Sequence, residues 1–300
     1  MNFVKHKNIF FIISGILILP GLISLFTKGL KLGIDFTGGT LMEIRSDKFN
    51  ASKKEEIQEL IKKQDVEVSS VQLSGDNAYI IRAKEFNQSK NNQVMAELNK
   101  KYEKVEESRF ETVGPTIGSE LTRNAILALI VSSTFIVLFI AYSFRTVPKP
   151  ASSFRFGITA VAALLHDALF ILGVFSILGW TLNVEVDSLF VTALLTVIGF
   201  SVHDTIVVYD RIRENLIKVK APTFEDTVNL SIWETLARSI NTSTTVIIVL
   251  LALLLFGGES IRWFVFALLI GIVSGTYSSI FNAAQLLVVW QDYSDKKKLS

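Results

Sequence analysis

The sequence contains no cysteine and only three histidines among its 300 residues. These absences exclude a disulfide framework, a thiolate metal site and a cysteine nucleophile, and three histidines are too few for a histidine-rich metal cluster. The formal net charge of +2 is too small for a nucleic-acid footprint, and the basic residues are scattered over loops. We therefore expect no metal site, no cofactor and no nucleic-acid partner.

Half of the residues are hydrophobic and the mean hydropathy is +0.43, with the apolar residues gathered in blocks. A helix needs about 20 apolar residues to cross the hydrocarbon of a bilayer. Six blocks approach or exceed this length; four carry no charge and two contain one aspartate each, Asp167 and Asp204. The expected fold is an α-helical membrane protein with transmembrane helices at residues 8–27, 123–144, 156–178, 188–209, 237–256 and 263–290.

The first block has the basic flank of a secretory signal peptide, but no small-residue cleavage site follows it, so we interpret it as a retained anchor. Lys and Arg are concentrated in the short loops on one side of the expected bundle, and the short loops on the other side hold only Arg262. By the positive-inside rule, both termini, a loop at 210–236 and a tail at 291–300 are expected in the cytoplasm. Residues 28–122 are then extracytoplasmic.

The extracytoplasmic segment has the pattern of a small α+β domain. Strands are predicted at 39–46, 66–73, 78–83 and 105–113 and helices at 52–64 and 88–102, the βαββαβ order of the ferredoxin-like fold. Gly75 to Asn77 supply a turn between the middle strands. With no histidine and no nucleophile motif, the domain is expected to be a contact surface, and the protein is not expected to be an enzyme. The predicted core comprises Leu41, Ile44, Ile57, Leu60, Ile61, Val66, Val68, Val71 and Leu73.

Two glycine-containing segments bracket this domain, GIDFTGG at 33–39 and GPTIGSEL at 114–121. Neither has the Gly-Lys-Ser/Thr sequence of a phosphate loop. They form either simple turns or a moving joint, because glycine provides the φ/ψ freedom that a hinge needs. The candidate joint residues are Gly33, Asp35, Gly38, Gly39, Gly114, Pro115 and Gly118.

An ionised side chain at the centre of a membrane helix costs at least about 2.5 to 3.5 kcal/mol, so Asp167 and Asp204 require an explanation. Each is either a neutral carboxyl group bonded to a neighbouring helix or a titrating group. By helical rise, Arg238 lies about 5 Å deeper toward the cytoplasm than Asp204, so its side chain could pair with Asp204 or extend to the interface. Arg211 falls on nearly the same helix face as Asp204. It either lines a path that leads to Asp204 or is a loop charge that sets the membrane topology.

Each aspartate follows a histidine, His166 or His203. Successive residues of a helix point about 100° apart, so we expect neither histidine to pair with its neighbouring aspartate. Either histidine could relay protons near neutral pH or serve as a packing residue.

Several segments together carry a family resemblance. They are GIDFTGG (33–39), VGPTIGSEL (113–121), HDA (166–168), GFSVHDTIVVYDRIREN (199–215) and RSINTS (238–243). On these segments, which occur in family order, the chain resembles the SecF subunits of the bacterial Sec protein-translocation machinery, a family of the resistance-nodulation-division superfamily. His203 departs from the family pattern, which usually has Asn at this position.

The resemblance implies a bundle like those of that superfamily, located in the cytoplasmic membrane. The implied partners are SecD, the SecYEG channel, often YajC, and the translocating preprotein, which the proton motive force helps to draw across. Asp204 and Arg238 match the carboxylate and the arginine implicated in proton movement, and Asp167, Arg211 and His203 are further candidates for the proton path.

Two other functions stay open. A small-molecule exporter of the same superfamily usually has a second external domain and twice as many spans. In a non-transducing assembly scaffold, the membrane charges would only fix the register of the helices.

Overall fold

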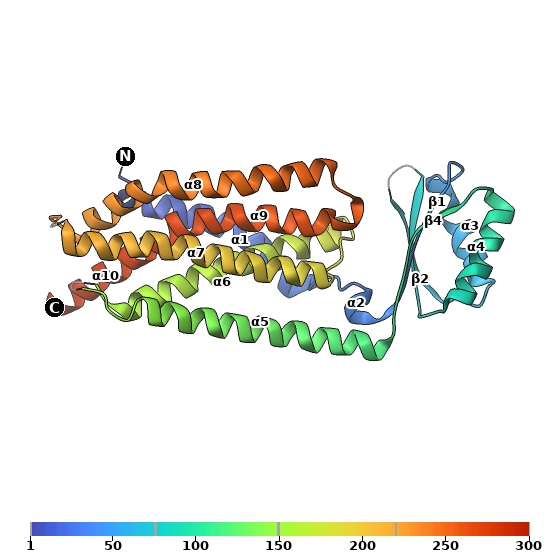
Figure 1. The fold of residues 1–300 in the computed structure, drawn as a ribbon, viewed down its shortest axis with the longest axis horizontal. Helices are drawn as coiled ribbons and strands as arrows, with labels where there is room; N and C mark the ends of the chain where they lie inside the picture. Colours follow the sequence, from blue (N-terminus) through green and yellow to red (C-terminus); the bar gives the residue numbers. More distant parts are fainter. Residues whose placement is uncertain (1, 75–76, 149–150, 220, 300) are drawn as a thin grey trace. The chain divides into compact units, whose positions relative to one another are not determined.

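The computed structural model describes residues 2–74, 77–148, 151–219 and 221–299 (Figure 1). The chain divides into two compact units, Met1–Lys31 with Leu127–Ser300, and Leu32–Ile126. We call the first the helical unit and the second the sheet unit, and describe each by itself. The expected turn residues Gly75 and Asp76 lie outside the described residues.

The helical unit consists of long apolar helices. Among the described residues, six helices are long and apolar enough to cross a membrane. The segment η4 is π-helical, and α9, η4 and α10 together form one spanning stretch, Arg262–Ser294. In chain order the elements are η1 (Val4–His6), α1 (Lys7–Lys28), α5 (Pro115–Ser143), α6 (Ser153–Thr181), α7 (Ser188–Lys218), α8 (Phe224–Phe256), η3 (Glu259–Ile261), α9 (Arg262–Ser278), η4 (Ser279–Ala283) and α10 (Ala284–Leu299). Helix α5 belongs to the helical unit only from Leu127 onward, because its residues up to Ile126 belong to the sheet unit.

Most of the helices are longer than the expected spans, because hydropathy detects the apolar part of a helix and not its polar ends. Helix α5 begins at Pro115, where the missing N–H of proline leaves no helical hydrogen bond unmade. Residues 210–236, expected as a loop, are mostly helical, since α7 continues to Lys218 and α8 begins at Phe224. Thr223 starts α8 by accepting a hydrogen bond from the Asp226 N–H.

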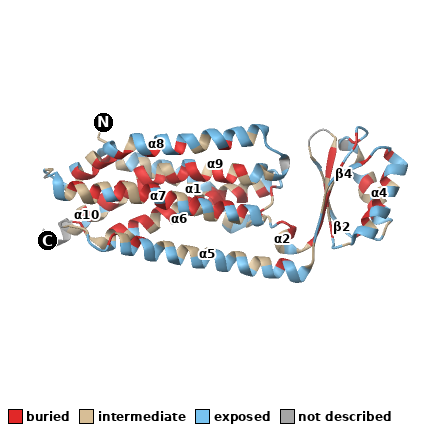
Figure 2. Cartoon of the chain, viewed as in Figure 1, coloured by how far each residue is buried: buried red, intermediate tan, exposed pale blue. Residues whose placement is uncertain are grey.

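Helices α6, α7 and α9 are the most buried of the helical unit, and α5 exposes most of its surface (Figure 2). Small residues allow the helices to approach closely. A Cβ built on Gly21 of α1 would lie 2.8 Å from the Gly173 Cα of α6, and one built on Gly275 of α9 would lie 3.1 Å from the Ser201 Cβ of α7. Short polar side chains of neighbouring helices therefore come within hydrogen-bond distance.

The sheet unit is a small antiparallel sheet with two helices packed against it (Figure 1). The strand order is β2-β3-β1-β4, and every neighbouring pair is antiparallel. The strands and the two principal helices follow the expected order, with bounds within two residues of those predicted. The elements are α2 (Ile34–Thr37), β1 (Gly39–Arg45), η2 (Ala51–Lys53), α3 (Lys54–Lys62), β2 (Val68–Ser74), β3 (Ala78–Ala83), α4 (Gln88–Tyr102) and β4 (Glu106–Val113).

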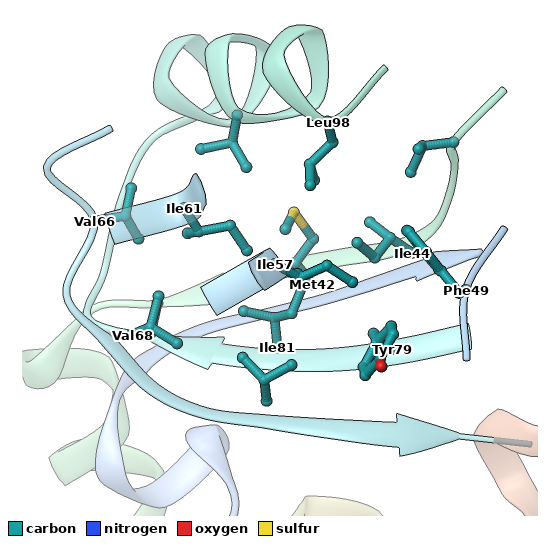
Figure 3. Close-up of a cluster of buried hydrophobic side chains, with 14 of the residues drawn as sticks. Met42, Ile44, Phe49, Ile57, Ile61, Val66, Val68, Tyr79, Ile81 and Leu98 are labelled. Atoms are coloured by element: carbon teal, nitrogen blue, oxygen red, sulfur yellow. The ribbon is translucent and has the colours of Figure 1, made fainter. Parts of the chain in front are cut away.

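The core of the sheet unit lies between the sheet and helices α3 and α4 (Figure 3). Strand alternation places Met42 and Ile44 in this core, while Leu41 is buried outside it. The prediction for Leu73 is wrong: this side chain is 41% exposed near the end of the edge strand β2. The other buried members shown include Ile57, Ile61, Val66, Val68, Tyr79, Ile81 and Leu98.

Candidate functional site

Asp167 lies in the middle of α6 and is completely buried. Its Oδ2 accepts hydrogen bonds from the Ser201 Oγ of α7 at 2.6 Å and from the Ser278 Oγ of α9 at 2.5 Å. Its Oδ1 accepts a hydrogen bond from the Ser274 Oγ of α9 at 2.8 Å. The three hydroxyls replace the water that a carboxylate would otherwise bind, so the buried aspartate joins three helices.

The sequence of α9 explains how two serines reach one carboxylate. Ser274 and Ser278 are four residues apart and therefore lie on the same face of the helix. Gly271 and Gly275 stand on neighbouring turns, and a Cβ on Gly271 would lie 2.4 Å from a methyl carbon of Val197 in α7. Because these glycines have no side chain, α9 can approach α7 closely. The short serine side chains need this close approach to form their hydrogen bonds.

His166 also contacts Asp167, so the expectation that these two residues do not pair is wrong. The His166 Nδ1 lies 3.0 Å from the Asp167 Oδ1. The Cβ directions of successive helical residues diverge, but the side-chain torsions turn the imidazole and the carboxylate toward each other. On its other side, the His166 Nε2 lies 3.0 Å from the Asn282 Nδ2 of η4, and the same amide nitrogen donates to the Ser14 Oγ of α1 at 2.8 Å.

Asp204 forms a second site on α7 and is 2% exposed. Its Oδ2 accepts a hydrogen bond from the Thr276 Oγ1 of α9 at 3.2 Å, and the Thr276 Oγ1 lies 2.5 Å from the Ser243 Oγ of α8. Ser243 and Thr276 line an open groove of about 260 Å³ between α8 and the α9–η4 stretch. A chain of hydroxyls therefore connects the carboxylate to the surface of the helical unit.

The two sites are linked through α7. Thr205 stands next to Asp204, and its Oγ1 lies 2.8 Å from the Ser279 Oγ of η4. Both of these hydroxyls donate to the backbone carbonyl of Ser201, whose side chain bonds to Asp167. The polar residues inside the helical unit thus form a continuous layer across α6, α7, α9 and η4.

Arg238 and His203 lie away from these contacts. Arg238 is exposed, and none of the ion pairs among the described residues joins it to Asp204. Its helix buries Ser239 and Ser243, so Arg238 projects to a different face of α8. His203 is likewise exposed, on a different face of α7 from Asp204.

Arg211 belongs to an ion-pair cluster at the polar ends of α7 and α8. Its Nε lies 2.7 Å from the Glu234 Oε2 of α8, and its Nη1 lies 2.6 Å from the Glu214 Oε2 of its own helix. Asn215 donates to the same Glu234 oxygen at 2.6 Å. In this structure, Arg211 and its partners connect α7 to α8.

The two glycine-containing segments lie against each other in the sheet unit. Gly38 and Gly39 have φ values of 71° and 122°, which favour glycine. A Cβ on Gly118 would lie 3.0 Å from the Gly38 N, and one on Gly39 would lie 2.8 Å from the carbonyl oxygen of Ala83. GIDFTGG, which contains the short helix α2, and the first turns of α5 therefore form one tightly packed junction.

Sequence reasoning missed Asn282, Thr276 and Ser14 as members of the polar layer. Ser201, Ser274 and Ser278 stand in the sequence as small residues that permit packing, but their hydroxyl groups also donate to Asp167. The available signal was the four-residue spacing of polar residues within apolar helices. It indicates which residues share a face, but not which helix that face meets.

Comparisons with known proteins agree with this architecture. The family described as "Protein export membrane protein SecD/SecF, C-terminal" matches residues 93–293, and the "SecD/SecF GG Motif" matches residues 23–48. The protein translocase subunit SecF of Thermobaculum terrenum is 45% identical over 304 residues, which cover 97% of this chain and 94% of that protein. The SecF subunit of Anaerolinea thermophila is 40% identical over 293 residues and is covered to 94%.

Two longer relatives carry the same region. The protein translocase subunit SecDF of Bacillus subtilis is 38% identical over 302 residues, which make up 99% of this chain but 39% of that protein. The crystal structure of a Thermus SecDF, a translocon-associated membrane protein, superposes with a TM-score of 0.83 at 31% identity and covers 97% of this chain. The chain spans 39% of the length of that solved chain. The chain therefore belongs to the SecD/SecF family of protein export membrane proteins, as a SecF-type subunit.

Proposed function

We propose that this chain uses the proton motive force to assist protein export, and that Asp204 is the group that binds and releases the proton. The observation that carries the proposal is the environment of Asp204. Its side chain is 2% exposed within a membrane-spanning helix, and two hydroxyls connect it to an open groove. Hydroxyls both donate and accept hydrogen bonds, so Ser243 and Thr276 can pass a proton to the carboxylate.

Protonation of Asp204 removes a charge whose burial is costly, and the preferred packing of the surrounding helices changes with it. A proton that crosses with the membrane potential releases about 2.3 kcal/mol per 100 mV, enough to bias a two-state equilibrium tens of fold. We assign to Arg238 the stabilisation of ionised Asp204. This requires a second state, in which α8 has turned so that the exposed guanidinium of Arg238 faces α7. Asp167, Arg211 and His203 are assigned supporting roles along the path.

We further propose that the chain works in a complex with SecD. The SecDF relatives support this pairing, because the region that matches this chain makes up 39% of a single longer protein in Bacillus subtilis. The SecYEG channel, YajC and the translocating preprotein are partners that the family resemblance implies.

For the orientation, we propose that both termini lie in the cytoplasm and that residues 28–122 lie outside the cytoplasmic membrane. The Lys7 Nζ of α1 lies 3.1 Å from the Asp292 Oδ2 of α10, so the two ends of the helical unit's chain lie at one end of that unit. The basic loops support a cytoplasmic position for that end.

We assign the sheet unit to the ferredoxin-like fold, which its strand order and two helices support. The packed glycine junction is proposed as the joint at which this unit changes orientation when Asp204 changes charge.

The test is an Asp204→Asn variant, reconstituted with SecD and the SecYEG channel in proteoliposomes. We expect the proton gradient to lose its stimulation of preprotein translocation, because the amide cannot bind and release the proton. Asp210→Asn is the matched control, since Asp210 is an exposed carboxylate of the same helix that pairs with Arg213. If the Asp204→Asn variant, correctly inserted and still in complex, sustained full proton-dependent translocation, the proposal would be wrong.

An assembly scaffold is the second candidate function, because Asp167 binds hydroxyls of two neighbouring helices and fixes their register. A pair of labels placed across residues 33–39 separates the two functions. A label distance that responds to the proton gradient supports the motor, and a distance that ignores the gradient supports the scaffold.

A further inference from the structure

We propose that His166 and Asp167 form a second proton-binding pair, distinct from Asp204, in which a proton taken up at the His166 Nε2 is sensed by Asn282 of the π-helical segment η4. The proton comes from the aqueous phase and returns to it. The charge of the pair therefore changes from −1 to zero on uptake. The use of this pair in export rests on the proposed function, but the protonation and its coupling to Asn282 do not.

The orientation of the Asn282 amide sets the form of the neutral imidazole. The amide nitrogen Nδ2 of Asn282 lies 3.0 Å from the His166 Nε2, and an amide nitrogen can only donate. The Nε2 therefore accepts, and the hydrogen of the neutral ring is on Nδ1, which lies 3.0 Å from the Asp167 Oδ1. The carboxylate thus orients the ring and leaves the basic nitrogen facing Asn282.

Uptake of a proton makes this arrangement incompatible with the Asn282 side chain. A protonated Nε2 and the amide Nδ2 would both be donors at the same contact. Asn282 must then present its Oδ1 to the histidine, which requires the amide to rotate by about half a turn.

Ser14 of α1 can adapt to that rotation. Its hydroxyl now donates to the Asn282 Oδ1 at 3.1 Å and accepts from the Nδ2 at 2.8 Å, so it can bond to either end of the amide. The contact between α1 and η4 therefore survives with reversed polarity. Asn282 lies in a π-helical segment, a feature that interrupts the regular hydrogen-bond ladder and is frequent at functional sites.

The side chains that hydrogen-bond to the His166–Asp167 pair carry no charge, so proton uptake is what changes the charge of the pair. The side chains that bond to the pair are Ser201 of α7, Ser274 and Ser278 of α9, and Asn282 of η4, and all of them are neutral. Among the described residues, the ion pair of His166 is with Asp167. Asp204 lies one turn beyond Ser201 on α7, and its carboxylate contacts Thr276 instead.

The experiment is solid-state NMR of the full chain in lipid bilayers with nitrogen-15-labelled histidine and asparagine, and the Asn282 signal is identified by its loss in the Asn282→Leu variant. The sequence has three histidines, so a His6→Gln, His203→Gln background leaves the His166 signal alone. We expect a neutral ring with its hydrogen on Nδ1 at pH 9, conversion to the imidazolium as the pH falls, and a change of the Asn282 amide signal over the same pH range. A neutral ring with its hydrogen on Nε2, no imidazolium down to pH 4, or an Asn282 signal that ignores the titration would each overturn the proposal.

Two variants separate this site from the proposed function. Asn282→Leu should shift the pH midpoint of His166, and Ser14→Ala is a milder change that should shift it in the same direction if the leucine variant does not fold. If neither variant shifts the pH midpoint of His166, the coupling between His166 and Asn282 is contradicted. Asp204→Asn should leave the His166 titration in place, and its loss there would show that the two aspartates form one site.

Discussion

Gly21 of α1 and Gly173 of α6 pack backbone against backbone. A Cβ on Gly21 would lie 2.8 Å from the Gly173 Cα, and a Cβ on Gly173 would lie 2.7 Å from the Gly21 Cα. On the next turn of each helix, the Ser24 Oγ of α1 lies 2.8 Å from the Ser176 Oγ of α6. The close approach of the two helices makes this hydroxyl contact possible.

Gly173→Val should therefore separate α1 from α6. The added side chain meets backbone atoms that cannot move aside, and overpacking of this kind costs about 1–3 kcal/mol. A lower thermal unfolding temperature of the full chain in detergent would report the loss. Gly157→Ala on the same helix is the control, because a Cβ there meets nothing within 4 Å, and equal effects of the two changes would contradict the packing argument.

Asp167→Ala should destabilise the protein more than the loss of any one of its donors. The change leaves the hydroxyls of Ser201, Ser274 and Ser278 without their acceptor, and breaking such a buried network costs about 3 kcal/mol or more. Ser274→Ala should cost about 1 kcal/mol, since the remaining donors still bind the carboxylate.

Thermal unfolding of both variants measures this difference. Ser132→Ala, a partly exposed serine of α5 that bonds to its own helix, provides the baseline. An Asp167→Ala protein as stable as the Ser132→Ala protein would show that the network does not hold the helices.

Arg211→Lys should weaken the connection between α7 and α8. The guanidinium bonds to Glu234 and Glu214 at the same time, and an ammonium group does not reproduce this fork. Because these side chains are about one-third exposed, we expect a small loss of stability that shrinks further in high salt.

Arg213→Lys is the matched control for Arg211, since its ion-pair partner Asp210 lies on the same helix. The chain has no native cysteine, so a pair of cysteines introduced at the ends of α7 and α8 reports the connection by its cross-linking rate. Identical rates for the two lysine variants would contradict an inter-helix role for Arg211.

The elements of this fold are largely predictable from its sequence. Blocks of apolar residues indicate the membrane helices, and alternation places the strands of the sheet unit within two residues of their observed bounds. The helix ends are less predictable, because residues such as Pro115 and Lys218 continue a helix into polar surroundings without adding hydropathy.

The candidate site is predictable only in part. Asp167 and Asp204 stand out because a carboxylate in hydrocarbon is costly, and this argument needs no knowledge of neighbouring helices. Their partners do need it: helical rise brings Arg238 to a suitable depth, but the facing side chain of α8 is Ser243. His166 could not be assigned from the helical angle, because side-chain torsions rather than Cβ directions bring it to Asp167.

Glu56 of the sheet unit should make stability depend on pH in acid. The Lys101 and Lys53 ammonium groups beside it lower the pKa of this carboxyl group from 4.5 to about 2. A group with a lowered pKa in the folded state stabilises the fold above its ordinary pKa and loses that contribution as the pH falls. The contribution of Glu56 is therefore complete above about pH 4.5 and is lost toward pH 2.

Glu56→Gln removes this contribution, which we expect to be about 0.2–1 kcal/mol at pH 7 because the pair lies at the surface. Hydrogen exchange of core amides such as Met42 and Ile44 in the full chain measures it, with wild type and variant compared at each pH. The two proteins should differ at pH 7 and converge as the pH approaches 2. Glu103→Gln is the control, since the Glu103 side chain is 77% exposed beside Lys48. A Glu56→Gln protein that differed from wild type equally at every pH would show that the loss comes from packing and not from the charge.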